Sequence, residues 1–290
     1  MSHQLAATIL LPTTADRGPL LPISVGSILN QSVTDLEVFI MGDGVTEATR
    51  QVIHELIRQD SRIRFFDHEK DSRRGELNRH AALQEARGNI IGYLCDRDIM
   101  LPNHVEIIGQ LLSNADFAHT LMYKILIDDK IQLRFRRDFS LAHDRAVAAT
   151  CNHVIPLSFG AHTLDMYHRL PFGWRTTPRK TETDTYMWRQ FLAENSCRVN
   201  SSTIPTILYF KRGSHPGLPV AERLIELDRW TARVNEPDFL SNHIECVRDA
   251  LIRDRSYQAA RIDDLQITIE QRDTFLGGCK TIARNLLHRK

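Results

Sequence analysis

Short apolar runs alternate with amphipathic stretches along the first 95 residues of the chain. Four runs are rich in aliphatic and aromatic residues and end at polar turns, which is typical of strands buried in a sheet. They are residues 6–11, 36–41, 63–66 and 90–94. The stretches between them carry apolar side chains at helical spacing. These are residues 20–33, 45–59 and 76–86, with Gly88 placed to close the third helix. The alternation predicts a parallel sheet with helical crossovers.

Polar residues follow three of these predicted strands, at Thr13, at Asp43 and at the triplet Asp96-Arg97-Asp98. The carboxyl ends of neighbouring parallel strands meet at one edge of a sheet, where open α/β folds bind ligands. Two carboxylates one residue apart repel each other unless a cation joins them, and Mg²⁺ and Mn²⁺ share carboxylate ligands with phosphates. The chain has neither of the usual glycine-rich phosphate loops. A nucleotide held through carboxylates and a metal is therefore expected.

The middle and end of the chain predict further elements. A helix is expected over 105–112, paired strands over 117–127 and 131–135, and a strand over 203–210. Thr183 or Asp184 can cap a helix whose apolar face carries Met187, Trp188 and Phe191. Residues 220–234 are helical in pattern. From residue 241 the sequence is charged, without a strand signal, and its apolar stripe is irregular.

Composition excludes several classes of protein. The 290 residues are 42% hydrophobic and 25% charged, as in an ordinary soluble globular protein, and the net charge of +1 gives no case for nucleic acid as a partner. The five cysteines form no C-x-x-C pair, which favours a reducing compartment. No signal-peptide core or membrane-spanning run is seen. We expect a cytoplasmic location.

Several motifs, taken in order and spacing, resemble a family 2 glycosyltransferase. They are Leu11-Pro12-Thr13, residues 27–32 leading to 35–40, Gly42-Asp43-Gly44, Asn78, Ala86-Arg87-Gly88, and residues 93–98 with Pro102. The resemblance runs over the first 115 residues and more thinly to residue 215. It implies the α/β GT-A fold, with a mainly parallel central sheet and helices on both faces. We predict a GT-A domain at 1–215, divided into a nucleotide-sugar-binding half (1–112) and an acceptor-side half (113–215). A helical extension would occupy 216–290.

The resemblance also implies a reaction: metal-dependent, inverting transfer of a hexosyl group from a nucleotide-diphosphate donor, with UDP as the default, to a hydroxyl of a saccharide or another acceptor. Asp184 matches the family's general base. Asp98, Asp96 and His215 would bind Mn²⁺ or Mg²⁺. The residues expected to contact the nucleotide-sugar are Thr13, Asp43, Arg74, Asn78, Asp96 and Arg212.

The chain departs from the family pattern at several positions. Gly42, Cys95 and Arg97 stand where acids are usual, and Thr183 replaces a glutamate. Leu77 replaces a basic residue for which Arg73, Arg74 or Arg79 could substitute. The acidic motif can be aligned in two registers. Asp98 is an acid in both, which makes it the preferred metal ligand.

Two alternatives remain open. The first is a catalytically inactive GT-A domain that acts as a binding module through its helical tail. The departures from the family pattern keep this alternative open, whereas the retention of both Asp98 and Asp184 counts against it. The second is a sugar-nucleotidyltransferase, although residues 12–18 are a poor version of the phosphate-binding loop that such enzymes need. The C-terminal helices could pair with a second copy, and the basic residues 284–290 could touch an anionic membrane surface peripherally.

Overall fold

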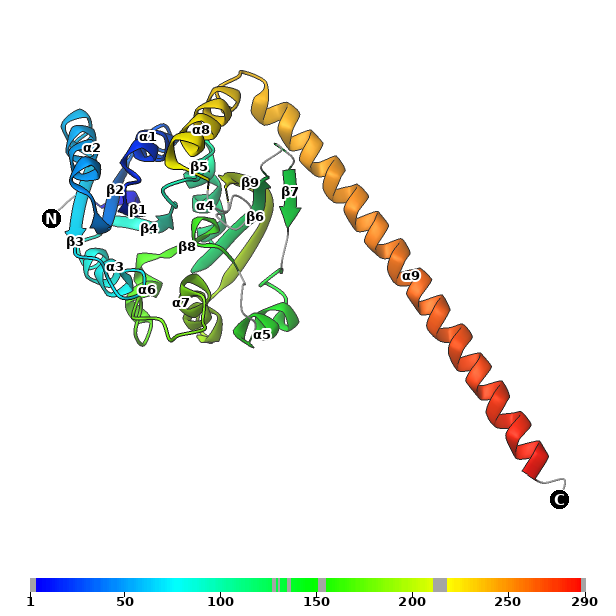
Figure 1. Cartoon of the computed structure of the whole chain (residues 1–290). Helices are drawn as coiled ribbons and strands as arrows, with labels where there is room; N and C mark the ends of the chain where they lie inside the picture. Colours follow the sequence, from blue (N-terminus) through cyan, green and yellow to red (C-terminus); the bar gives the residue numbers. More distant parts are fainter. Residues whose placement is uncertain are drawn as a thin grey trace. The chain divides into compact units, whose positions relative to one another are not determined.

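The computed structural model describes residues 4–126, 129, 131–134, 137–150, 155–210 and 218–287 (Figure 1). The chain divides into two compact units, Met1–Phe239 and Leu240–Lys290. Helix α8 (Val220–Val234) therefore belongs to the first unit, whereas the sequence had placed it in an extension beginning at residue 216.

Nine strands of the described chain form one sheet, in the order β3-β2-β1-β4-β8-β6-β9-β5, with β7 paired to β6. Their bounds are β1 Leu5–Ala15, β2 Leu36–Val45, β3 Ile63–His68, β4 Gly88–Tyr93, β5 Ile99–Met100, β6 Phe117–Ile125, β7 Ile131–Arg134, β8 Gly160–Thr163 and β9 Val199–Tyr209. Strands β3, β2, β1 and β4 are parallel neighbours. The next strand, β8, is antiparallel to both β4 and β6, and β9 runs parallel to β6. The predicted α/β GT-A architecture is confirmed, with the antiparallel strands confined to the half that follows β4.

Helices connect and cover the strands of the first unit (Figure 1). The α-helices are α1 Leu21–Leu29, α2 Glu47–Gln59, α3 Glu76–Leu83, α4 His104–Leu112, α5 Ala142–Thr150, α6 Leu164–Arg169, α7 Thr183–Ala193 and α8. Two short 3₁₀ turns, η1 (Gly18–Leu20) and η2 (Leu157–Phe159), precede α1 and β8. Helix α2 begins where Thr46 accepts a hydrogen bond from the amide of Thr49, as expected of a threonine N-cap.

Gly88 has a different role from the one that its position suggested. Helix α3 ends at Leu83, and Gly88 is the first residue of β4 rather than a helix cap. A Cβ atom on Gly88 would lie 2.2 Å from the backbone of both Ala7 and Thr8. Only glycine lets β4 approach β1 this closely, so this residue fixes the entry of the strand that leads into the acidic triplet.

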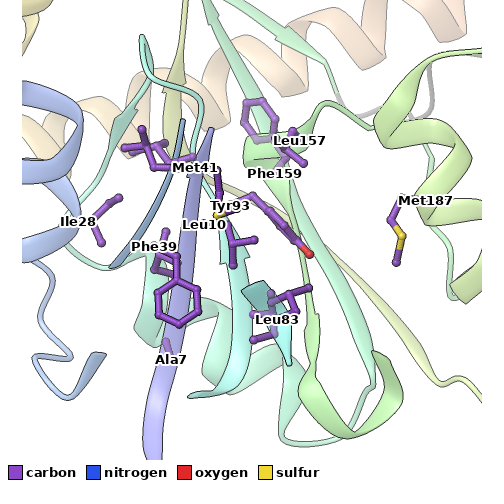
Figure 2. Packing of buried hydrophobic residues seen from close by; sticks show 14 of the residues in the cluster. Ala7, Leu10, Ile28, Phe39, Met41, Leu83, Tyr93, Leu157, Phe159 and Met187 are labelled. Atoms are coloured by element: carbon purple, nitrogen blue, oxygen red, sulfur yellow. The ribbon is translucent and has the colours of Figure 1, made fainter. Parts of the chain in front are cut away.

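One hydrophobic cluster joins both halves of the first unit. Figure 2 shows Leu10 of β1, Phe39 of β2 and Tyr93 of β4 with Phe159 of η2, and all four belong to the same buried cluster. Met187 of α7 is a further member of it. The described residues of the two predicted halves, 1–112 and 113–215, therefore share one hydrophobic core.

Helix α9 runs from Phe239 to Leu287, so all of it except Phe239 belongs to the second unit. Among its described side chains, Ile262, Leu265 and Ile269 are between 56% and 59% exposed. Across the described residues, no helix is both long enough and apolar enough to cross a bilayer.

Candidate active site

A cavity of about 540 Å³ opens at the carboxyl ends of β1, β2 and β4. Thr13 of β1, Asp43 of β2 and Asp96, just after β4, all line it. The parallel pairing of β1 with both β2 and β4 brings these strand ends side by side. The structure thus assembles the three strand ends that the sequence had singled out.

Asp96 is 1% exposed and is surrounded by donors. The Thr13 hydroxyl donates to Oδ2 at 3.0 Å, and Arg17 Nη1 donates to Oδ1 and Oδ2 at 2.9 and 3.1 Å. Arg97 Nη1 lies 3.8 Å from Oδ1. Arg17 comes from the loop after β1, and sequence reasoning did not select it. Nothing in the local pattern indicates that this loop folds back to the end of β4.

Asp98 lies in the same triplet but faces away from the cavity. It is fully buried and does not line the cavity. The Ser158 hydroxyl donates to Oδ2 at 2.6 Å and the Phe210 amide donates to Oδ1 at 3.1 Å. Burial raises the pKa of Asp98 to about 6, against the lowering effect of Arg97 and of these hydrogen bonds. The carboxylate joins the end of β4 to η2 and to the residue after β9.

Replacing Asp98 by alanine should lower the free energy of unfolding by about 2–4 kcal/mol without any metal present, because two buried donors lose their acceptor. Urea denaturation of the metal-free protein measures this change. Asp98→Asn keeps one oxygen for the Phe210 amide and should lose less. Asp165→Ala is the control, since Asp165 is 83% exposed and pairs only at the surface with Arg169. Unchanged stability of Asp98→Ala would mean that Asp98 has no structural role of this kind.

Arg97 is held between the two acids. Its Nε donates to the carbonyl oxygen of Phe210 at 3.1 Å, and its side chain is 17% exposed. Burial alone would lower its pKa, but the neighbouring acidic groups, Asp98 and Asp96 among them, raise it instead. The guanidinium is therefore a fixed positive charge in the cavity wall.

The Asp43 carboxylate also has partners within the chain. Its Oδ2 forms an ion pair with Lys70, and its Oδ1 accepts a hydrogen bond from the Asp71 amide at 2.6 Å. Lys70 and Arg74 line the same cavity. Of the positions predicted to contact the nucleotide-sugar, Thr13, Asp43, Arg74 and Asp96 meet at one cavity, and Asn78 is not among its lining residues.

Arg79 is a cavity residue that the sequence indicated only as a substitute for Leu77. It is 5% exposed, yet it lines the cavity. Its guanidinium lies 4.9 Å from the centre of the Trp174 ring, and Nη2 donates to the Arg74 carbonyl at 2.9 Å. Burial lowers its pKa, with Glu76 acting in the opposite direction. Arg79 adds a further positive charge to the cavity wall, set against an aromatic face.

Asp184 lines the same cavity from α7. The N-cap of this helix is Glu182, rather than Thr183 or Asp184 as the sequence suggested, and the Thr183 hydroxyl donates to Glu76 at 3.3 Å. Desolvation raises the pKa of Asp184, although its hydrogen bond with the Thr185 amide and the charge of Arg74 lower it. The effect of burial outweighs that of these groups, so the net shift of the Asp184 pKa is upward. A carboxylate that binds a proton more tightly is a better base.

Trp188 fixes α7 against the sheet, one turn after Asp184. Its indole Nε1 donates to the Ile155 carbonyl at 3.0 Å, and its ring contacts those of Tyr93 and Phe117. A Cβ atom on Gly160 would lie 2.8 Å from this ring. The indole thus sits in a space that β8 leaves only because residue 160 has no side chain.

The described residues do not fit a divalent cation at the acidic triplet. They contain no group of three or more His, Cys, Asp or Glu side chains placed to hold a metal ion. Both oxygens of Asp96 accept hydrogen bonds from Arg17, and one also accepts from Thr13, while both oxygens of Asp98 accept from Ser158 and the Phe210 amide. His215 and Arg212, the other predicted ligand and phosphate contact, lie outside the described residues. Metal binding by Asp96, Asp98 and His215 stays a prediction from the sequence.

The sequence model of the family described as Glycosyl transferase family 2 matches residues 8–171. GalNAc(5)-diNAcBac-PP-undecaprenol beta-1,3-glucosyltransferase of Campylobacter jejuni is 29% identical over 112 residues, which is 39% of this chain and 36% of that protein. A chondroitin synthase of Pasteurella multocida is 39% identical over 83 residues, 29% of this chain and 8% of that one. The matched regions are thus about a third or less of these relatives.

Solved structures share the fold at low identity. TarS residues 1–349 of S. aureus, solved in complex with UDP-GlcNAc, gives a TM-score of 0.56 at 16% identity, covering 80% of this chain and 68% of that one. The mannosyltransferase PcManGT of Pyrobaculum calidifontis, solved with GDP-Man and Mn²⁺, gives 0.52 at 15% identity, with 83% and 68% covered.

Proposed function

The chain belongs to glycosyltransferase family 2, and on that premise we propose that it transfers a sugar from a nucleotide-diphosphate donor to an acceptor hydroxyl. One observation carries the proposal. A single cavity holds polar groups from three parallel strand ends, six basic side chains, and a carboxylate from α7. The basic residues are Arg17, Lys70, Arg74, Arg79, Arg97 and Lys124. A donor diphosphate and an acceptor hydroxyl can therefore meet within one cavity.

In the proposed reaction, Asp184 takes the proton from the acceptor hydroxyl as its oxygen attacks the anomeric carbon of the donor. The bond from that carbon to the diphosphate oxygen breaks, and the leaving diphosphate carries the electron pair. Attack from the face opposite the leaving group inverts the anomeric configuration. Positive side chains of the cavity, such as Arg74 and Lys70, stabilise the negative charge that develops on the diphosphate.

The donor is proposed to carry UDP. The structural relatives do not share one donor, since TarS was solved with UDP-GlcNAc and PcManGT with GDP-Man. The test must therefore compare bases. Thermal unfolding in UDP, GDP, dTDP and CMP should reveal one nucleotide that stabilises the protein, by about 2.7 kcal/mol when it is present at a hundred times its Kd.

Matched arginine variants localise this effect to the cavity. Arg74→Ala should weaken the stabilisation by the preferred nucleotide, because Arg74 lines the cavity. Arg58→Ala should leave it unchanged, since Arg58 is an exposed residue of α2 that pairs with Glu55. No stabilisation by any of the four nucleotides would contradict the proposal. Stabilisation without transfer from any donor sugar would instead support an inactive binding module.

A further inference from the structure

Building on the function proposed above, we propose that the cavity binds the donor diphosphate through the guanidinium groups of Arg17 and Arg97, without a divalent cation at the Asp96-Arg97-Asp98 triplet. The two arginines would supply the positive charge at this point of the cavity. The donor class stays a nucleoside diphosphate sugar, and what is new is the way its diphosphate is held.

The first support is the orientation of the two acids. A cation shared by both acids of the triplet would need an oxygen from each carboxylate, but only Asp96 lines the cavity. Asp98 gives both of its oxygens to buried donors, the Ser158 hydroxyl and the Phe210 amide. Turning Asp98 towards the cavity would break both hydrogen bonds and leave these donors buried without an acceptor.

The second support is the charge around Asp96. Both of its oxygens accept hydrogen bonds from Arg17 Nη1, at 2.9 and 3.1 Å, and Arg97 Nη1 stands 3.8 Å from Oδ1. Two guanidinium groups thus already neutralise this one carboxylate. A divalent cation added at Asp96 would stand beside two positive charges, and repulsion at such distances is strong in a desolvated site.

The third support is the binding capacity that the two arginines keep. The described side-chain hydrogen bonds of Arg17 are all donated by Nη1. In Arg97, Nε donates to the carbonyl oxygen of Phe210, and Nη1 lies near Asp96. A guanidinium has five N–H donors in a planar fork that matches phosphate oxygens. Both side chains therefore retain donors for an anion while their partners hold them in place.

The fourth support is that a third arginine lies close to Arg17 and Arg97. Arg17, Arg97 and Arg223 of α8 together border a neighbouring cavity of about 210 Å³. They come from the loop after β1, the loop after β4 and a helix far along the chain. Guanidinium groups gather in this way at sites that bind phosphate.

The test is the dependence of nucleotide binding on metal. Titration calorimetry with UDP, GDP and inorganic pyrophosphate would be run on the full chain, once in EDTA and once in Mn²⁺. We expect one nucleoside diphosphate to bind with Kd values that agree within about twofold in the two buffers. Arg17→Ala should then weaken its binding about 10- to 100-fold, the effect of losing charge-assisted hydrogen bonds, whereas Arg58→Ala should not.

A second variant covers the case in which a change at Arg17 alters the fold. Arg97→Asp removes a fixed positive charge and places a third carboxylate between Asp96 and Asp98. Because three neighbouring carboxylates attract a divalent cation, Mn²⁺ should raise the thermal unfolding midpoint of that variant but not that of the wild type. Binding that requires Mn²⁺ in the wild type, or that tightens more than tenfold with it, would overturn the metal-free site and leave the proposed function intact. Absence of binding by every probe in both buffers would overturn the proposed function as well.

Discussion

Replacing Asp184 by asparagine should lower the rate of sugar transfer by about 10²–10⁴-fold, the range typical for the loss of a general base. Asparagine has nearly the same shape but cannot accept the proton of the attacking hydroxyl. Binding of the nucleotide should persist, because the diphosphate is held by the basic residues of the cavity. Steady-state transfer and calorimetric titration of the nucleotide measure the two quantities separately.

The pH profile of the wild type gives an independent readout of the same residue. The base works when ionised, so activity should fall as the pH falls through the pKa of Asp184. Because desolvation raises that pKa above the ordinary value of 3.8, the acidic limb should lie above pH 3.8 and be absent from the residual activity of Asp184→Asn. Glu182→Gln removes a negative charge that raises the pKa of Asp184, so it should move the acidic limb to lower pH. Asp165→Asn is the matched control, since Asp165 is an exposed residue outside the cavity, and it should retain the wild-type profile. Unchanged turnover in Asp184→Asn would remove this residue from the mechanism.

Replacing Trp188 by alanine should reduce the free energy of unfolding by about 3–5 kcal/mol, the range for truncating a buried aromatic side chain. Trp188 is fully buried, its ring packs among Tyr93, Phe117 and Phe191, and its Nε1 hydrogen bond to Ile155 is lost as well. Urea denaturation gives the magnitude. Transfer activity at a temperature where the variant is folded should also fall, because α7 carries Asp184.

Two variants make this prediction specific. Trp188→Phe keeps most of the ring contacts and should lose less stability than Trp188→Ala. Phe172→Ala truncates an aromatic side chain that is 54% exposed, and it should cost far less. An equal loss of stability in Trp188→Ala and Phe172→Ala would contradict the role given to Trp188.

The parallel half of the fold was predictable because each of its elements has a local signal. The apolar runs that became β1, β2 and β3 end within a few residues of the observed strands, and α8 has the predicted bounds. The short strands β5 and β8 lack such a signal. Each is held by pairing with strands distant in sequence, β5 by β9 and β8 by β4 and β6.

The acidic triplet shows where a sequence argument fails. Asp96 and Asp98 stand one residue apart just after a predicted strand, and they were expected to share a cation. The triplet lies in a turn, in which the Asp98 amide donates to the Cys95 carbonyl at 3.0 Å. The turn sends the two carboxylates to different surroundings. Arg17 was missed for a related reason, since its contact with Asp96 joins positions 79 residues apart.

The place of β8 in the sheet has a consequence for synthesis of the chain. Strand β4 pairs with β1 on one edge, and its other edge pairs with β8, which begins at Gly160. Residues 94–159 must be translated first, which takes roughly 3–13 s at about 5–20 residues per second. A four-stranded sheet of β3, β2, β1 and β4 that formed in that interval would present β4 as an open, apolar edge strand. Such an edge pairs readily with other chains, so the emerging protein should depend on chaperones that bind hydrophobic segments at the ribosome.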